Sequence, residues 1–508
     1  MDAIDTLPTP VTAQPRTRTP SALLREVLDI RARVSREARA TLTSWSERIT
    51  RSEFRPCAEN LAAYLALRRH DLARVQQELE YWGISPLSRS EAHVMHSLDA
   101  VAATLAAVAR EELPPDVTRP GDGDYARGYA MLEEEKRALF GADPGGPQAR
   151  IMVTLPAEAA SDMRLCKALI AGGVDCARIN CAHDSADLWR GMAANMRAAA
   201  RDAERTCPIL IDLGGSKMRI KRVSGEPPVR VRSGDRLALV VDGAVERELP
   251  TLFCSDREII EHLRKGATVW IDDGKIGCTV EETQPDGVLL RVAAAREKGN
   301  LLKPGKGLNC LDTTPGLPAL TAKDLVDLDF VVQHADMVGY SFVQTPEDVR
   351  LLQRELAARG RADMPVVLKI ETRAAVQNLP SLIVATAGRQ PAAVMLARGD
   401  LALALGFERL AEVQEEILSL CEAAHVPAIW ATQVLERLIK KGRPARAEAT
   451  DAAMSQRAEC VMLNKGPYLV KGVRFLEDVL RRMDRHQSKK SPRLTALHAW
   501  RADQTLKV

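Results

Sequence analysis

Residues 365–400 read PVVLKIETRAAVQNLPSLIVATAGRQPAAVMLARGD. This segment contains two short apolar runs, Val366–Glu371 and Ala393–Asp400, separated by a stretch with the length and spacing of a helix. Strands of a parallel sheet are buried on both faces and therefore read as continuous runs of Val, Ile and Leu. The segment predicts a strand–helix–strand unit with parallel strands.

The same alternation continues on both sides of this segment. Six further strands are expected at Ile151–Leu155, Cys176–Asn180, Pro208–Leu213, Met337–Phe342, Pro427–Gln433 and Cys460–Asn464. Eight strand–helix units are what a (β/α)8 TIM barrel requires. The predicted fold class is therefore α/β, with the barrel formed by residues 149–222 and 307–485.

Three other segments complete the predicted domain organisation. Residues 223–306 alternate apolar and polar side chains between Gly-containing turns, which predicts a small β-barrel domain inserted as a lid after the third strand. Residues 1–148 read as a Thr- and Pro-rich tail at 1–20, expected to be disordered, followed by an all-α module. Ser88 and Glu91 are a candidate cap for one of its helices, and residues 486–508 form a C-terminal tail.

Composition narrows the class of protein. The formal net charge of the 508 residues is +3 and aromatic residues make up 4%, which argues against a nucleic-acid partner. The 10 Cys form no CxxC pair, so free buried thiols in a reducing compartment are expected. The sequence has no signal-peptide pattern and no apolar run of the roughly 20 residues that a membrane helix needs. We therefore expect a soluble, cytoplasmic protein with no membrane partner.

Charged side chains stand at the ends of the fifth and sixth strands. Strand alternation places Lys369 and Glu371 on the same side, toward the barrel mouth. Glu371 and Asp400 offer two hard oxygen ligands from neighbouring strands, as Mg²⁺ prefers. Lys369 beside such a metal could stabilise charge on a phosphoryl group or an enolate. The alternative is a purely structural Lys–Glu ion pair.

Other strand ends add groups suited to an anionic substrate. Thr432 follows the seventh strand, and Gly399 and Asp400 are expected to open a helical turn whose N–H groups could hold a carboxylate. Arg178 on the second strand is suited to phosphate. The third strand runs into residues 212–219, which read DLGGSKMR and carry two more cations.

Taken together, these motifs resemble those of the pyruvate kinase family over residues 149–485. The resemblance is carried by ARIN at 177–180 with His183, DLGGSKMR at 212–219, IDDG at 271–274, KGLN at 306–309, LPALTAKD at 317–324, SFV at 341–343, KIE at 369–371, ARGDL at 397–401, ATQVL at 431–435 and RPARAEATD at 443–451.

The resemblance implies transfer of the phosphoryl group of phosphoenolpyruvate to ADP, giving pyruvate and ATP. It implies that Arg178 grips the phosphoryl group and that Lys369 stabilises the transition state. It implies that Glu371 and Asp400 hold Mg²⁺ or Mn²⁺, and that Gly399, Asp400 and Thr432 position the substrate. Thr432 would also help to protonate the enolpyruvate through water.

The nucleotide side of the site also follows from the resemblance. Asn180, His183, Arg219 and Lys306 are expected to bind ADP or ATP, with Lys306 at the returning hinge of the inserted domain. We further expect a homo-oligomer.

Two departures from the family pattern concern the monovalent cation. The usual RxNFSH is RINCAH here, so the Ser hydroxyl is replaced by Ala182. Lys217 stands where potassium-dependent members carry Glu, beside the Asn180 and Asp212 of that site. Because an ammonium can supply the charge of K⁺, we expect activity without K⁺. The alternative is that Lys217 only pairs with Asp212.

The end of the chain departs as well. The usual SGETA of the eighth strand is NKGPY at 464–468, which changes a loop at the adenine end of the site. The family's C-terminal domain has no counterpart after residue 485, so activation by a sugar phosphate through that domain is not expected. Two rival functions stay open: a regulatory homologue that binds phosphoenolpyruvate or nucleotide without turnover, and another Mg²⁺-dependent barrel enzyme acting on pyruvate enolates, such as an aldolase or lyase.

Overall fold

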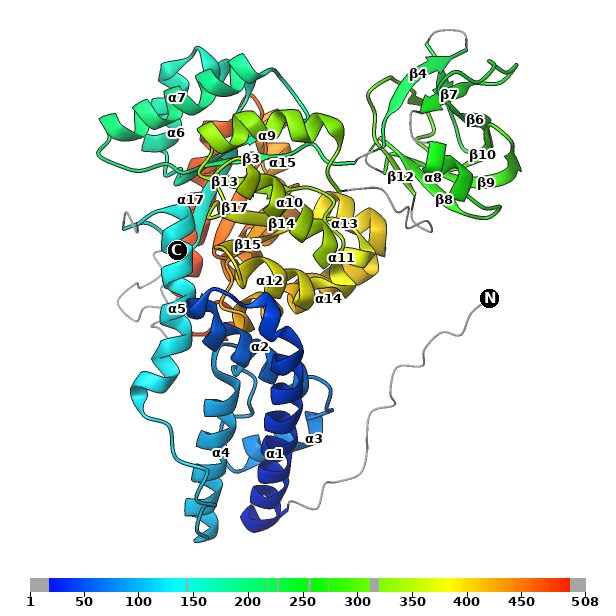
Figure 1. Cartoon of the computed structure of the whole chain (residues 1–508). Helices are drawn as coiled ribbons and strands as arrows, with labels where there is room; N and C mark the ends of the chain where they lie inside the picture. The colour runs from blue at the N-terminus through cyan, green and yellow to red at the C-terminus, as the bar shows by residue number, and fades with distance from the viewer. Residues whose placement is uncertain are drawn as a thin grey trace, which may run out of the picture. The chain divides into compact units, whose positions relative to one another are not determined.

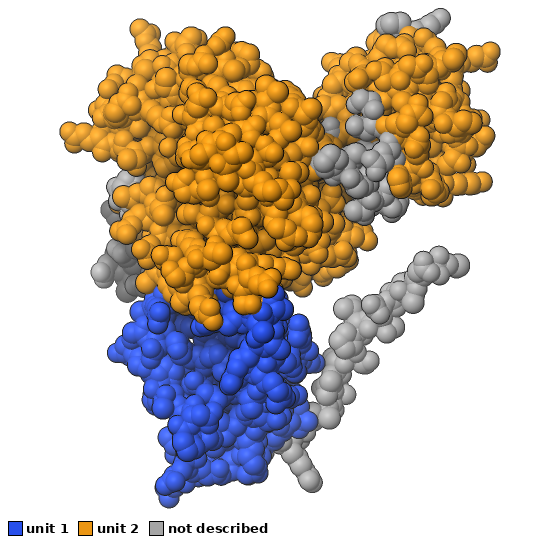
Figure 2. All heavy atoms as spheres, in the orientation of Figure 1, with its two compact units in different colours: residues 1–44, 58–129 blue, residues 45–57, 130–508 orange. Residues whose placement is uncertain are grey.

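The computed structural model describes residues 18–142, 145–216, 218–225, 228–254, 257–272, 274–310 and 319–493. Figure 1 shows the course of the chain and its helices and strands. The chain divides into two compact units, the first made of residues 1–44 and 58–129 and the second of residues 45–57 and 130–508 (Figure 2). Of the predicted N-terminal tail, residues 1–17 lie outside the described part of the chain.

The first unit is helical, as predicted, and its described residues contain no strand. Its helices are α1 (Pro20–Trp45), α2 (Arg55–Leu67), α3 (Ala73–Tyr81), α4 (Val94–Ala109) and α5 (Asp122–Phe140), with 3₁₀ turns at Ser46–Arg48, Ser52–Phe54 and Glu91–His93; α1, α2 and α5 each extend into the segments grouped with the second unit. The apolar stripe of α1, which includes Leu23, Val27 and Val34, is fully buried. The unit therefore has a hydrophobic core of its own.

The predicted cap by Ser88 and Glu91 is wrong. The helix α4 begins at Val94, and the N–H of Val94 donates to Asn60 Oδ1 of α2 at 2.8 Å. Glu91 instead lies in the preceding 3₁₀ turn. A side chain that is distant in sequence thus satisfies the first N–H of the helix, which spacing along the chain cannot reveal.

One helical stretch among the described residues, Glu91–Ala109, is long and apolar enough to cross a membrane by length and composition. However, 56% of that window is buried inside the protein. Leu98, Val101 and Leu105 face the core of the first unit, as expected for a core helix.

The second unit contains a closed barrel of eight parallel strands, which confirms the predicted fold class. Each predicted strand is present. The strands are β1 (Arg150–Thr154), β2 (Cys176–Asn180), β3 (Ile209–Asp212), β13 (Met337–Tyr340), β14 (Val366–Ile370), β15 (Ala392–Ala397), β16 (Ala428–Ala431) and β17 (Cys460–Leu463). Every residue of these eight strands is buried, except Asn180 at the end of β2. This burial on both faces explains why the strands read as apolar runs.

Helices follow the strands, and local caps fix where several of them begin. Thr321 and Thr345 each form a capping box with the Asp three residues later, so α9 and α10 begin directly after them. The helices of the barrel are α6 (Met163–Ala171), α7 (Ala186–Asp202), α9 (Ala322–His334), α10 (Pro346–Ala358), α11 (Arg373–Gln377), α12 (Leu379–Ala387), α13 (Arg398–Leu405), α14 (Phe407–Ala423), α15 (Glu436–Lys441), α16 (Arg446–Met454) and α17 (Leu469–Met483), with 3₁₀ turns at Ala157–Ala160 and Ser455–Arg457.

The last turn of α5 belongs to the barrel interior. Leu139 and Phe140 are buried in one cluster with the first residues of three strands, Cys176, Met337 and Cys460. These strand starts mark the N-terminal end of the barrel. The end of α5 therefore closes the barrel opposite its mouth.

The segment before α2 is also attached to the barrel. The backbone N–H groups of Thr50 and Arg51 both donate to the carbonyl of Gly388 at 2.8 Å. A Cβ atom at Gly388 would lie 2.6 Å from the carbonyl oxygen of Arg48, so this close approach requires glycine. The loop after α12 thus holds residues 48–51 through the carbonyl of Gly388, to which the Thr50 hydroxyl also donates at 3.4 Å.

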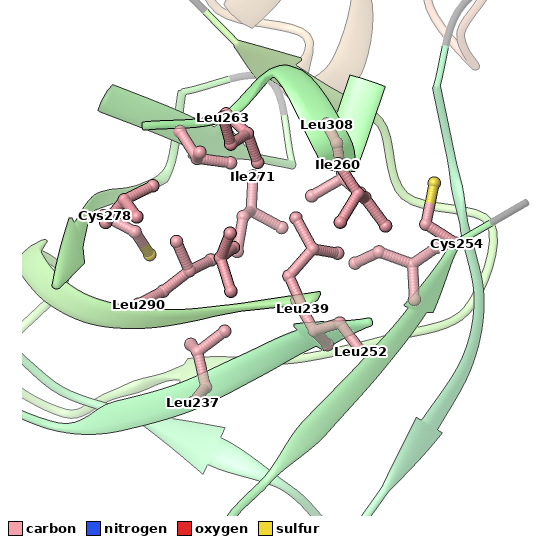
Figure 3. Close-up of a cluster of buried hydrophobic side chains, with 14 of the residues drawn as sticks. Leu237, Leu239, Leu252, Cys254, Ile260, Leu263, Ile271, Cys278, Leu290 and Leu308 are labelled. Atoms are coloured by element: carbon pink, nitrogen blue, oxygen red, sulfur yellow. The ribbon is translucent and has the colours of Figure 1, made fainter. Parts of the chain in front are cut away.

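The inserted segment forms a β domain with its own core (Figure 3). Its main sheet has the order β12-β8-β9-β10-β6-β7-β4, and β5 pairs with β11. The elements are β4 (Ile220–Ser224), β5 (Arg230–Val231), β6 (Arg236–Val241), β7 (Thr251–Cys254), α8 (Arg257–His262), β8 (Thr268–Ile271), β9 (Ile276–Gln284), β10 (Gly287–Ala294), β11 (Asn300–Leu301) and β12 (Leu308–Cys310). Leu239, Leu252 and Leu290 are fully buried at its centre.

Two further features concern the rest of the chain. The predicted C-terminal tail begins with a short antiparallel pair, β18 (Gln487–Ser488) and β19 (Ser491–Pro492). The described free cysteines are all buried, as expected for thiols in hydrophobic cores: Cys57, Cys166, Cys176, Cys181, Cys207, Cys254, Cys278, Cys421 and Cys460.

We expect Phe140→Ala to lower the free energy of unfolding by about 3–5 kcal/mol, because it leaves a cavity at the closed end of the barrel. The measurement is urea unfolding of the full chain followed by circular dichroism. Phe407→Ala is the matched control, since Phe407 is 66% exposed, and it should change stability by no more than about 0.5 kcal/mol. Equal unfolding midpoints for the two variants would show that α5 does not support the barrel.

Candidate active site

The C-terminal ends of the parallel strands form one mouth of the barrel, and most of the predicted site residues lie there. Lys369 is on β14, and Arg178 on β2 is two residues before Asn180, the last residue of that strand. The remaining residues of this group are Asp212 at the end of β3, Glu371 directly after β14, Gly399 and Asp400 in the first turn of α13, and Thr432 directly after β16.

Lys369 is buried and surrounded by three oxygen atoms. Its Nζ lies 2.6 Å from Ser341 Oγ, 3.2 Å from Glu371 Oε1 and 3.3 Å from Asp212 Oδ2. The Ser341 hydroxyl donates its own proton to the carbonyl of Leu213 at 2.7 Å, so it accepts from the ammonium group. Burial opposes the charged form, but Glu371 and Asp212 outweigh it and raise the pKa of Lys369. The side chain is therefore a fixed cation at neutral pH.

Arg178 is held by the same aspartate. Its Nε and Nη2 donate to Asp212 Oδ2 at 2.9 and 2.7 Å, and its Nη1 donates to Thr154 Oγ1 at 2.9 Å. Asp212 is fully buried, which opposes ionisation, yet the charges of Arg178 and Lys369 keep its pKa below the usual value. Asp212, at the end of β3, thus fixes two cations from β2 and β14, two strands that are not adjacent in the barrel.

A glycine opposite Asp212 makes this arrangement sterically feasible. A Cβ atom at Gly339 on β13 would lie 2.0 Å from Asp212 Oδ1. Neither Gly339 nor Ser341 could be given a role from the sequence. Both lie on or directly after β13, and the SFV motif at 341–343 was the only signal that pointed to this strand end.

Glu371 and Asp400 offer the carboxylates of the predicted metal site. Glu371 Oε2 accepts the N–H of Phe342 at 2.7 Å, and Asp400 Oδ1 accepts from Asn309 Nδ2 at 3.1 Å. Burial raises the pKa of Glu371, Lys369 opposes this shift, and the negative charge of Asp400 adds to it. Two carboxylates that disfavour each other's ionisation fit a divalent cation, which would neutralise both.

The number of protein ligands available to a metal is small. No group of three or more His, Cys, Asp or Glu side chains is assembled as a metal site anywhere in the described ranges. A cation at Glu371 and Asp400 would therefore take its other ligands from substrate and water, as Mg²⁺ commonly does.

Thr432 is placed by an unusual backbone conformation. The φ angle of Thr432 is +63°, which is unfavourable for a β-branched residue, and Gln433 and Leu435 are also left-handed. The conformation brings Thr432 Oγ1 to 2.7 Å from the N–H of Gly399, which donates to it. Thr432 and the start of α13 are thus joined directly.

Arg398 holds this strained turn and was not singled out from the sequence. Its Nε donates to the carbonyl of Ala431 at 3.1 Å, and its Nη2 donates to the carbonyl of Thr432 at 2.8 Å and to Asp451 Oδ2 at 2.9 Å. Arg398 and Asp451 both belong to the motifs that carry the resemblance, at 397–401 and 443–451. Arg398 is therefore a positioning residue for Thr432.

The residues predicted for the nucleotide fall into two pairs. Asn180 closes a turn at the end of β2, where its Oδ1 accepts the N–H of Ala182 at 2.9 Å. Close by in the sequence, the pKa of His183 is lowered by burial and then by the positive charges of Lys465 and Arg219. His183 is therefore neutral at pH 7 and faces a cationic region. Lys465 belongs to the NKGPY motif after β17, and its influence on His183 was not predicted from the sequence.

The second pair lies where the chain enters and leaves the inserted domain, with Arg219 just before β4 and Lys306 just before β12. Arg219 Nη1 donates to the carbonyl of Gly305 at 3.1 Å, and Lys306 Nζ lies 2.8 Å from Asp272 Oδ1. The backbone of Lys306 accepts the N–H of Ile220 at 2.9 Å, so the entering and returning segments are paired. Lys217, the predicted replacement for K⁺, lies outside the described residues.

The sequence is similar to that of known proteins over the whole barrel. The family model for the pyruvate kinase barrel domain matches residues 147–471. A pyruvate kinase of Rattus norvegicus is 30% identical over 332 residues, which cover 62% of this chain and 56% of the rat protein. A pyruvate kinase of Mycobacterium tuberculosis is 31% identical over 341 residues, covering 66% of this chain and 69% of that protein.

A third relative is similar to a comparable degree. A pyruvate kinase of Thermococcus litoralis is 30% identical over 341 residues. This chain spans little more than half the length of the rat relative. The family match, by contrast, includes every strand of the barrel and all the strand ends described above. The chain belongs to the pyruvate kinase family.

Proposed function

We propose that the protein transfers the phosphoryl group of phosphoenolpyruvate to ADP, giving pyruvate and ATP. The observation that carries the proposal is the placement of Lys369, whose ammonium group lies within 3.3 Å of Asp212, Glu371 and Ser341. Phosphoryl transfer depends chiefly on positioning and charge neutralisation. A buried cation beside a second cation and two carboxylates supplies these requirements.

The chain's own residues divide the work by charge. Arg178 binds the phosphoryl oxygens, since a guanidinium matches their geometry. Lys369 stabilises the negative charge that spreads over the transferring group, and burial strengthens this interaction. Glu371 and Asp400 would hold Mg²⁺ or Mn²⁺, which supplies Lewis-acid charge neutralisation when bound.

The substrate carboxylate and the enolate proton are assigned to the strained turn. Gly399 and Asp400 open α13, whose first N–H groups favour an anion. Thr432 positions the substrate and passes a proton through water to the enolpyruvate carbon. Its hydroxyl accepts from the Gly399 N–H, which leaves the hydroxyl proton free to point toward substrate or water.

We assign the nucleotide to Asn180, His183, Arg219 and Lys306. Because Arg219 lies shortly before residues 223–306 and Lys306 is the last of them, we propose that this β domain acts as a lid that brings cations to ADP or ATP. Residues 149–222 and 307–485 would then be the catalytic barrel. We also propose that the protein is a cytoplasmic homo-oligomer.

A second candidate function rests on the end of β17. The loop there reads NKGPY at 464–468 in place of the family's SGETA. Tyr468 is 46% exposed and packs against Gly442, where a Cβ atom would lie 3.0 Å from the Tyr468 ring. An altered adenine end is compatible with a homologue that binds phosphoenolpyruvate and nucleotide without turnover.

We expect Lys369→Met to lower kcat by at least about a hundred-fold, because it removes the cation that stabilises the transferring group. The assay measures pyruvate formed from phosphoenolpyruvate, ADP and Mg²⁺. Lys167→Met is the matched control, since Lys167 is exposed on α6 and pairs only with Asp202 in the described structure. Full activity of Lys369→Met would overturn the assignment, whereas a parent protein that binds phosphoenolpyruvate without turnover would favour the second function.

For the strained turn, the comparison is between Thr432→Val and Thr432→Ser. The valine variant keeps the shape but loses the hydroxyl, so we expect kcat to fall at least about a hundred-fold. The serine variant keeps the hydroxyl and should retain most of the rate. If both variants were equally impaired, the backbone of the turn rather than the hydroxyl would be responsible.

The charge of Lys217 predicts independence from K⁺. We expect the parent rate to be the same in KCl and in tetramethylammonium chloride at equal ionic strength, and Lys217→Glu to become dependent on KCl. The reason is that a fixed ammonium replaces the mobile cation. A many-fold rise of the parent rate with KCl would contradict this role.

A further inference from the structure

A cavity of about 440 Å³ lies at the end of the barrel opposite the proposed active site. Its lining includes Pro208, Met337 and Pro365, which stand at or just before the starts of β3, β13 and β14. The size is that of a site for a small organic molecule. None of the residues assigned to catalysis or to the nucleotide lines this cavity.

One wall of the cavity is apolar. Leu139 and Met337 contribute side chains from the buried core at the end of α5 and the start of β13. Pro208 and Pro365 add two rings that carry no N–H donor. This wall suits a flat or branched hydrocarbon body and has little to offer a fully polar ligand.

The rim of the cavity carries cations. Arg197 and Arg201 are one helical turn apart on α7 and both line the cavity. Arg197 is 34% exposed, and its Nη2 lies 2.7 Å from Asp336 Oδ2. The same Asp336 oxygen accepts the N–H of Ile209 at 2.8 Å, so this carboxylate is already committed to the protein.

Two groups on the rim have donors available. Within the described structure, the Arg201 guanidinium makes no hydrogen bond or ion pair, and the Thr206 hydroxyl makes no hydrogen bond. A basic residue in the last turn of α7 also interacts favourably with the helix dipole. The helix dipole explains why a basic residue stands at position 201. It does not explain why Arg197 and Thr206 line the same cavity as Arg201.

We propose that this cavity binds a phosphate monoester of a small molecule with an apolar body. The phosphate lies between Arg197 and Arg201 and accepts from the Thr206 hydroxyl, because two guanidinium groups match a dianion with three oxygens. The body packs on Leu139 and Met337. Binding at this site does not depend on the proposed activity.

The cavity is linked to the mouth of the barrel by the strands themselves. Pro208, Met337 and Pro365 are each four residues before a member of the buried network, namely Asp212, Ser341 and Lys369. At about 3.3 Å per residue, the two ends are about 13 Å apart. A ligand that shifts the strand starts therefore acts on the groups that hold the two buried cations.

Phenyl phosphate is the probe, titrated calorimetrically into the full-length parent protein. We expect saturable binding that Arg201→Gln and Arg197→Gln each weaken about tenfold, since each removes one charged hydrogen-bonding partner. Arg190→Gln, exposed on the same helix outside the cavity, is the matched control and should bind as the parent does. Phenol and inorganic phosphate, each lacking one half of the probe, should bind more weakly.

Hydrogen exchange locates the bound probe. We expect protection of the amides at 206–207 and 336–338. Because Arg201 makes no ion pair in the described structure, Arg201→Gln should fold normally and keep the test decisive. Equal affinity of the parent and Arg201→Gln, protection confined to residues near Arg178 and Lys369, or absence of saturable binding would each overturn the proposal. None of these outcomes bears on the proposed phosphoryl transfer.

Discussion

The fully buried carboxylate of Asp212 is the interaction on which the barrel mouth depends. Removing an ionised carboxylate from water is costly, and the cost is offset only when well-placed opposite charges surround it. Arg178 and Lys369 provide these charges from β2 and β14, and the absent side chain of Gly339 leaves the necessary room. Each cation is in turn oriented by the same group. The positions of the two cations are therefore set before any substrate arrives, which is the condition for electrostatic catalysis.

A second constraint is placed around the strained turn after β16. A left-handed Thr432 is unfavourable by itself, and it persists because Arg398 and Gly399 both bind it. The mouth thus has two rigid parts. One is held by the buried carboxylate of Asp212 and the other by the buried guanidinium of Arg398. The inserted β domain has its own core, with Arg219 just before its first strand, β4, and Lys306 just before its last strand, β12. Under the proposed function, this arrangement separates the rigid groups assigned to the substrate from the groups assigned to the nucleotide, which belong to the inserted domain.

Much of this could be predicted from the sequence because burial leaves a direct trace in composition. The eight strands are continuous apolar runs, and strand alternation correctly placed Lys369 and Glu371 on one side, with 3.2 Å between Nζ and Oε1. The roles of Ser341, Gly339 and Arg398 could not be predicted, because they depend on neighbours from other strands. The sequence does not contain the register that brings these neighbours together. The cap of α4 was mispredicted for the same reason, since Asn60 is far from Val94 along the chain. Leu139 and Phe140 look like the end of any amphipathic helix, so their place in the barrel interior could not be predicted.

The buried position of Leu139 and Phe140 means that the segment matched by the family model is not the same as the segment that forms the barrel core. The family match begins at residue 147, after the residues that close the barrel. A fragment cut at that point would keep every strand, helix and site residue of the family region but would leave an apolar hole at one end. Exposed core surface of this kind favours aggregation. The segment that the family model matches is therefore shorter than the segment that packs as one core, and expression of the barrel alone should start before α5.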